Sequence, residues 1–195
     1  IIVSTLVNMF IFPPNYIKTI ETNIKKIYID LGTALSKIDN KTKMERMLRK
    51  IRQEIVQTEV LIRYQTDEAD FHPLFDNEAF SQTNIVRKID QLELIHYHIN
   101  NLQPIYIKQT AFSEDHIIII HQALDDLTAY MKGNEQIKLE QHEMTLKNLM
   151  RMFWGSNHGK ETFNNSLLPD ELILLYELIS IFYVVKETKQ LSTTI

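Results

Sequence analysis

The sequence predicts an all-α fold, an antiparallel bundle of about five or six helices, and two observations carry that prediction. Glycine and proline are sparse, four and five in 195 residues, which favours a few long elements over many short strands joined by turns. Apolar residues also recur at helical spacing along most of the chain. The hydrophobic content of 44% is ordinary for a globular protein, and the length suffices for one domain with a core.

The first helix is predicted over residues 17–38, with Asn15 as its N-cap. Its apolar residues recur in alternating steps of three and four, a heptad seam along which a helix packs lengthwise. We expect the first five of them to form a packing seam, either inside the bundle or between subunits: Ile17, Ile20, Ile24, Ile27 and Leu31. Gly32 costs a helix about 1 kcal/mol relative to alanine, and its missing side chain would allow a close helix crossing.

The second helix follows a turn at Asp39 and Asn40 and should run antiparallel to the first, because the connection is short. Its inward residues are expected to be Met44, Met47, Leu48, Ile51, Ile55 and either Leu61 or Ile62. Residues 66–84 lose the helical period and contain Pro73. We therefore expect a loop or a short helical excursion there.

Four further helices are expected. The third begins near Thr83 and is kinked or ended by Pro104, and the fourth begins at Ser113 and closes at Gly133. The fourth carries the apolar run 117–120. The fifth spans 134–155 and should present Ile137, Met144, Leu149 and Phe153 inward. Pro169 opens the last helix, which is apolar nearly all round and so belongs at the bundle centre.

Charge is distributed unevenly along the chain. Residues 37–63 carry eight basic and four acidic side chains, whereas residues 64–195 carry ten basic and nineteen acidic ones. A basic element beside an acidic body is typical of a domain at an anionic membrane surface, although a solvated helix face is the simpler alternative. The residues expected to face anionic lipid or an anionic substrate are Lys43, Arg46, Arg49 and Lys50. The acidic body argues against nucleic acid as a partner.

The first twelve residues, IIVSTLVNMFIF, contain no charge. A helix of this length rises roughly 18 Å, while a bilayer core of about 30 Å needs about 20 residues. We therefore expect residues 1–12 to be the end of a transmembrane helix and residues 13–195 to be the domain attached to it. Lys18, Lys25 and Lys26 place that domain on the cytoplasmic side of the cell membrane by the positive-inside rule.

The run LVNMFIFPPNY, from Leu6 to Tyr16, resembles the junction of the aromatic acid exporter family, also called fusaric acid resistance-like proteins. The resemblance covers these eleven residues and implies a multi-spanning membrane transporter with a cytoplasmic helical domain. It also implies a homo-oligomer, contacts with membrane lipid and with the protein's own upstream membrane helices, and a small aromatic acid as substrate in the membrane part. The resemblance assigns no transport residue to this chain.

Histidines and carboxylates do not form an enzyme or metal motif. His96 and His98 are two residues apart and should point to different sides of a helix. Glu93 and His96 match the Glu-x-x-His pattern of di-iron bundles, but that site requires the pattern on two helices and it occurs here once. His142 begins a zincin-like motif, but Leu146 stands where the second histidine is required. Asp125 and Asp126 diverge in the same way.

With no cysteine and no phosphate-binding loop either, we expect no enzyme, no cofactor and no metal. Trp154, Phe153 and the nearby methionines Met144, Met150 and Met152 are expected to be core more often than an adaptable binding groove. The alternative to a transporter domain is a soluble interaction or regulatory module that docks a partner helix through the seam of residues 17–38.

Overall fold

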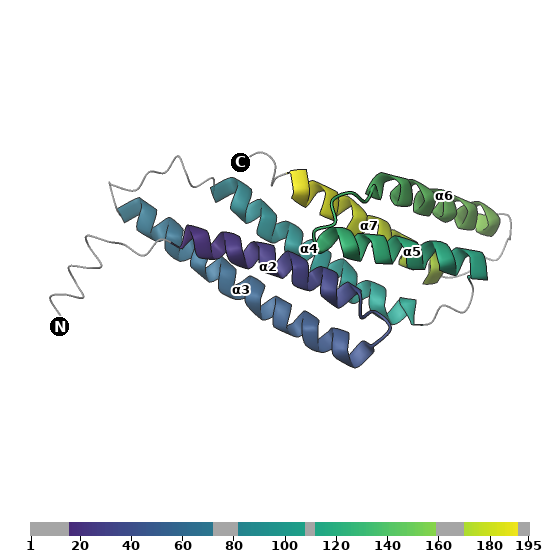
Figure 1. Ribbon diagram of the computed structural model, residues 1–195, viewed down its shortest axis with the longest axis horizontal. Helices are drawn as coiled ribbons and strands as arrows, with labels where there is room; N and C mark the ends of the chain where they lie inside the picture. The colour runs from purple at the N-terminus through teal and green to yellow at the C-terminus, as the bar shows by residue number, and fades with distance from the viewer. Residues whose placement is uncertain (1–15, 72–81, 108–111, 159–169, 191–195) are drawn as a thin grey trace.

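The computed structural model describes residues 16–71, 82–107, 112–158 and 170–190, and every regular element in them is a helix (Figure 1). The all-α prediction is therefore confirmed for this part of the chain. The six helices are α2 (Ile17–Leu35), α3 (Lys41–Phe71), α4 (Gln82–Tyr106), α5 (Glu114–Met131), α6 (Leu139–His158) and α7 (Asp170–Gln190). None of them is long and apolar enough to cross a membrane. The predicted membrane-helix end, the Asn15 cap, Pro73 and Pro169 lie outside the described residues.

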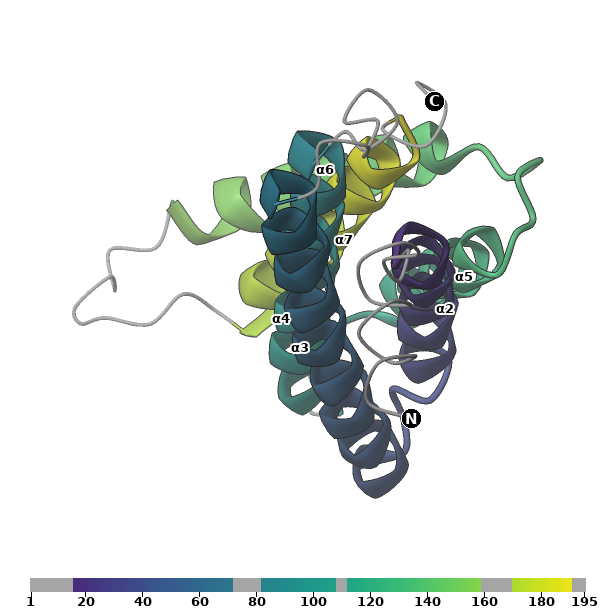
Figure 2. The same cartoon turned by 90° about the vertical axis from the view of Figure 1, so that its left-hand side faces the viewer.

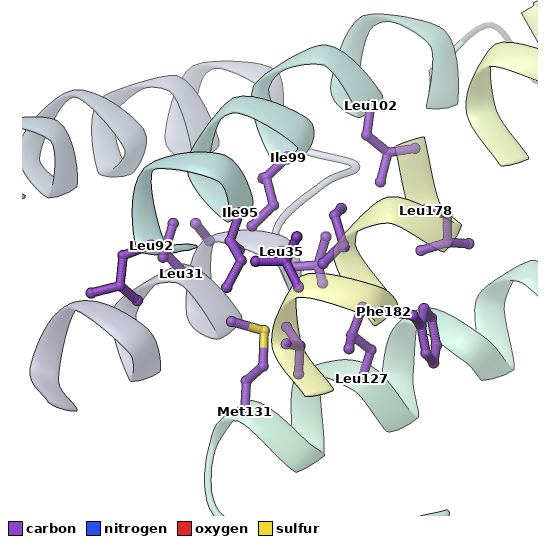
Figure 3. Close-up of a cluster of buried hydrophobic side chains, with 14 of the residues drawn as sticks. Leu31, Leu35, Leu92, Ile95, Ile99, Leu102, Leu127, Met131, Leu178 and Phe182 are labelled. Carbon is purple, nitrogen blue, oxygen red and sulfur yellow. The ribbon is translucent and has the colours of Figure 1, made fainter. Parts of the chain in front are cut away.

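The helices pack around a shared interior formed mainly by α2, α4, α5 and α7. The most extensive contact is between α4 and α7, followed by that between α2 and α3. Figure 1 shows α2 and α3 side by side in opposite directions, with α3 along one edge of the molecule. Figure 3 shows side chains of α2, α4, α5 and α7 meeting in the core, among them Leu31, Leu92, Leu127, Met131 and Phe182.

The α2–α3 hairpin turns earlier than the sequence predicts. α2 ends at Leu35, not at residue 38, and the backbone N–H of Ser36 donates to the carbonyl of Gly32. Ile38 is buried although it lies in the turn. Its apolar side chain extends the helical spacing past Leu35, which is why the sequence predicts a longer helix. Asn40 then caps α3, because its side-chain oxygen accepts from the backbone N–H of Lys43 at 3.0 Å.

The close crossing predicted at Gly32 is confirmed. A Cβ added to Gly32 would stand 2.8 Å from Cβ of Met131, closer than two such atoms approach in folded proteins. α2 and α5 therefore approach each other to a distance that only glycine permits at this position.

The predicted loop at residues 66–84 is wrong at its start, whereas the expected start of the next helix near Thr83 is confirmed to within one residue. α3 continues to Phe71 and α4 begins at Gln82. The apolar period stops before the helix does because Gln65 occupies a core position, three residues after buried Ile62, and is itself 1% exposed. A polar residue on the buried face removed the signal that periodicity depends on.

The remaining helices agree with the sequence in order but differ in detail. Ser113 caps α5, and Gly133 adopts a positive φ of 106° after it, both as predicted. Pro104 lies inside α4, two residues before its end. α7 is largely buried, as expected for a central helix, through Leu172, Leu174, Leu175, Leu178, Ile181, Phe182, Val184 and Val185.

α6 is the least well predicted helix. It begins at Leu139 and not at residue 134, and it passes Gly155 to end at His158. Met144, expected inward, is 66% exposed. The true inward row is Leu139, Leu146 and Leu149, because steps of seven and three keep side chains on one face whereas Met144 falls off it.

Candidate functional site at the start of the described chain

The strongest candidate site is the junction where the chain joins the folded helices, formed by Tyr16, Tyr64 and Gln65. The backbone N–H of Tyr16 donates to Oε1 of Gln65 at 2.8 Å, and the two rings of Tyr16 and Tyr64 lie 6.5 Å apart at 40°. The first amides of a helix have no partner within the helix, so a buried side-chain acceptor from α3 satisfies one of them. Tyr16 is thereby fixed to α3.

A groove between α3 and α4 lies at the same end of the molecule. Its volume is about 360 Å³, and Ile62, Val86 and Ile89 supply its apolar part. Its polar lining consists of Glu59, Arg63, Thr66, Asp67 and Asp90. Three carboxylates against one guanidinium make the groove more suitable for a cation than for an organic acid.

The outer face of α3 is the row of exposed side chains opposite the core. Steps of three and four place these residues on one side of the helix: Lys43, Arg46, Arg49, Lys50, Gln53, Val56, Gln57, Val60 and Tyr64. Figure 2 shows α2 and α4 on the two sides of α3, which leaves this third side uncovered by the described helices.

The four predicted lipid- or substrate-facing residues all lie on this face and are exposed. Lys50 lies 3.8 Å from Glu54, while Lys43, Arg46 and Arg49 have no carboxylate within ion-pair distance among the described residues. The four occupy the first part of α3, whereas the junction contacts its second half at Tyr64 and Gln65. The structure therefore places the four cations on one face of α3 but away from Tyr16.

The predicted seam lies mainly inside the molecule. Ile20, Ile27 and Leu31 are fully buried, while Ile17 and Ile24 are half-buried. α2 packs against α3, α4 and α5, so its inward residues contact helices of the same chain. The seam therefore serves internal packing at its three deepest positions.

The two histidines of α4 diverge as predicted. His96 Nε2 donates to the backbone carbonyl of Leu48 on α3 at 3.0 Å, and burial is the main cause of a lowered pKa for His96. His98 Nδ1 donates to the Glu177 carboxylate on α7 at 2.6 Å, and Asn101 donates to the other oxygen at 3.3 Å. Glu93 pairs with Arg52 rather than with a histidine.

An ion-pair network around the buried carboxylate of Glu143, not predicted from the sequence, joins α6 to α7. Glu143 accepts from Lys147 at 2.5 Å and from Lys186 at 2.8 Å. Burial raises the pKa of Glu143, but the hydrogen bonds and charges of the two lysines outweigh it and lower the pKa overall. The i, i+4 spacing of Glu143 and Lys147 was visible in the sequence, whereas Lys186 is 43 residues away and was not.

The other motifs have ordinary structural roles. His142 donates to Asp126 at 2.6 Å, and Leu146 is a core residue. Within the described ranges, no group of three or more histidine, aspartate or glutamate side chains is placed to hold a metal ion. Met150 and Phe153 pack against the core, while Met144, Met152 and Trp154 are exposed, so the expectation of core holds for two of these five residues.

Comparison with known proteins finds relatives that are longer than this chain. The chain is 30% identical over 205 residues to a UPF0421 protein of Oceanobacillus iheyensis, a match that covers 95% of this chain and 57% of that protein. UPF0421 proteins of Bacillus cereus and Bacillus thuringiensis subsp. konkukian are 26% and 25% identical over 98% of this chain. No protein-family model and no solved structure matches. The chain thus spans 57% of the length of these relatives, whose name states no activity or substrate.

Proposed function

We propose that this chain is the cytoplasmic helical domain of a multi-spanning membrane protein that exports aromatic or other small organic acids. Residues 1–12 are then the end of a transmembrane helix, and residues 13–195 act in assembly of a homo-oligomer or in gating. The substrate pathway belongs to the membrane part, outside this chain. The domain itself performs no catalysis.

The junction is the observation that carries this proposal. A flexible tether would need no contact with the domain, whereas here the backbone of Tyr16 is hydrogen-bonded to a buried side chain of α3. Displacement of the segment before Tyr16 would therefore be transmitted to α3, and through Ile62 and Ile89 to the α3–α4 interface. That is the property a gating or assembly domain requires of its attachment point.

Two further observations support the same proposal. About four-tenths of each relative lies outside the part that matches this chain. That unmatched part is long enough to hold membrane helices. Leu6–Tyr16 also resembles the junction of the aromatic acid exporter family.

A soluble interaction module is the second candidate, and one observation favours it. Exposed side chains of α4 and α7 form a largely aromatic surface of Leu94, Tyr97, Tyr176 and Tyr183. His98 lies beneath part of it, with ring centroids 5.4 Å from Tyr97 and 6.4 Å from Tyr176. Tyrosine-rich surfaces of this kind are enriched at protein interfaces. The seam of residues 17–38 is less suitable, because its deepest residues are already buried.

An efflux assay tests the export proposal. Cells expressing the protein from its full coding sequence are loaded with a radiolabelled aromatic acid such as benzoate, and its release is followed with and without the protein. We expect faster release with the protein, and slower release when Gln65→Met loosens the junction. Membrane-inserted protein with no effect on the release of any aromatic acid would contradict the export function.

A further inference from the structure

The outer face of α3 combines two chemistries in separate halves. Its first half carries the cations Lys43, Arg46, Arg49 and Lys50. Its second half carries uncharged residues, of which Val56, Val60 and Tyr64 are 43%, 40% and 55% exposed. A helix face of this composition matches the interface of an anionic bilayer, where cations meet headgroups and apolar or aromatic side chains meet the acyl boundary.

Few carboxylates border this face. Glu45 lies four residues before Arg49 and pairs with Lys41 at 3.9 Å, and exposed Asp67 follows Tyr64 by three residues. Glu59 lines the α3–α4 groove, and Glu54 accepts from Lys26 of α2 at 2.5 Å. Among the four cations, only Lys50 has a carboxylate within ion-pair distance in the described residues, Glu54 at 3.8 Å. A second copy docked through the same face would bring no row of carboxylates to meet these cations, so the complementary charge comes from another kind of surface.

The junction fixes how such a surface would meet the protein. Tyr64 lies beside Tyr16, so the apolar half of the outer face adjoins the point where the preceding segment joins the domain. Arg46 is 18 residues before Tyr64, which is about 27 Å along the helix axis. An upright α3 would hold the cations far beyond the screening length of roughly 8 Å at physiological salt. Only an α3 that lies along the bilayer brings both halves into contact.

We propose that α3 lies along the membrane surface and that its outer face binds anionic lipid headgroups through its cations and the interface through Val56, Val60 and Tyr64. This inference rests on the proposed membrane attachment for its orientation. It adds a second contact, distinct from the tether, whose strength depends on salt and on lipid charge. The contact would hold the domain against the bilayer and orient α3 along it.

Vesicle co-sedimentation of the whole chain tests the proposal, with phosphatidylcholine vesicles compared with vesicles containing about one-third phosphatidylglycerol. The test variant combines Lys43→Gln, Arg46→Gln, Arg49→Gln and Lys50→Gln. The matched control combines Arg87→Gln, Lys132→Gln, Lys138→Gln and Arg151→Gln, which removes the same charge from exposed positions elsewhere. A second pair of variants tests the apolar half of the face. The double variant Val56→Gln, Val60→Gln is compared with the control double variant Ile118→Gln, Met144→Gln. Unchanged circular dichroism and thermal unfolding verify that each variant folds.

We expect the outer-face variant to bind anionic vesicles at least about tenfold more weakly than the control. High salt should likewise weaken the binding of the wild-type chain to anionic vesicles. The valine pair should weaken binding by a smaller factor and independently of salt. Equal binding by the two charge variants, or wild-type binding indifferent to phosphatidylglycerol, would overturn the proposal. Failure of the tether has a different signature, because it would leave this salt-sensitive binding intact while abolishing carbonate-resistant membrane association.

Discussion

The backbone N–H of Tyr16 donates a 2.8 Å hydrogen bond to Oε1 of Gln65, and the two residues are 49 positions apart in the chain. Gln65 is buried, and its side-chain amide lies in the core beside the backbone N–H of Tyr16 at the start of α2. An unpaired amide in the core would destabilise the protein, and the contact with Tyr16 removes part of that cost. The hydrogen bond makes the first residue of the described chain part of the domain's packing.

Removing this acceptor should loosen the start of α2. We expect Gln65→Met to lower the free energy of unfolding by about 1–2 kcal/mol, because a partly buried N–H loses its acceptor while side-chain volume is kept. Hydrogen exchange at the Tyr16 amide should accelerate, and urea titration should show the loss of stability. Gln57→Met, at an exposed position of the same helix, is the control. Equal exchange at Tyr16 in the two variants would show that the bond contributes nothing.

The glycines offer a test of the α2–α5 crossing. Gly32→Ala should destabilise the protein by about 1–3 kcal/mol, because the new methyl meets Met131 and outweighs the gain in helix propensity. Gly155→Ala should stabilise it by up to about 1 kcal/mol, since beyond the neighbouring backbone of α6 no atom of the described residues lies within 4 Å of the new Cβ. Thermal unfolding of the two variants measures both. A Gly32→Ala variant as stable as the wild type would contradict the close crossing.

Spacing alone located most of the core but not the polar contacts. The spacing assigns residues such as Ile27, Leu48 and Ile51 inward, because a covered helix face repeats every three or four residues. Gln65 broke that rule, and its role depends on a partner 49 residues away that no local pattern encodes. The same holds for Glu177, whose carboxylate contacts His98 and Asn101 across the α4–α7 interface.

The apolar run at the start of α5 shows why a hydrophobic segment cannot be read as uniformly buried. Ile120 is 2% exposed whereas Ile118 is 53% exposed, two residues apart on the same helix. Ile120→Ala should therefore cost about 2–5 kcal/mol, and Ile118→Ala should change stability by less than about 0.5 kcal/mol. Chemical denaturation measures both. Equal effects would mean that α5 is rotated relative to the core.

Acid should weaken the Glu143 network in a defined direction. The pKa of Glu143 is lowered in the folded protein, so the unfolded chain takes up a proton first as the pH falls. The contribution of Glu143 is therefore complete above its ordinary pKa of about 4.5 and is lost as the pH falls through that value toward the folded pKa. Glu143→Gln should lower stability at neutral pH by about 1–3 kcal/mol and flatten its dependence on pH below about 5.

Glu140→Gln is the matched control for that experiment. Glu140 is also near Lys186, at 3.8 Å, but its side chain is 68% exposed, so its pair should contribute little. Urea titrations at successive pH values compare the two variants. If Glu140→Gln flattens the acid limb as much as Glu143→Gln does, the buried network is not the source of the pH dependence.

Attachment to a membrane through the segment before Tyr16 is tested most directly by carbonate extraction. Membranes from cells expressing the protein from its full coding sequence, with a C-terminal tag, are washed at alkaline pH and separated by centrifugation. Carbonate strips contacts that depend on charge, including the one proposed for α3, but leaves transmembrane helices in the bilayer. We expect the protein to remain in the pellet. Its complete release into the supernatant would contradict the membrane attachment and, with it, the export function.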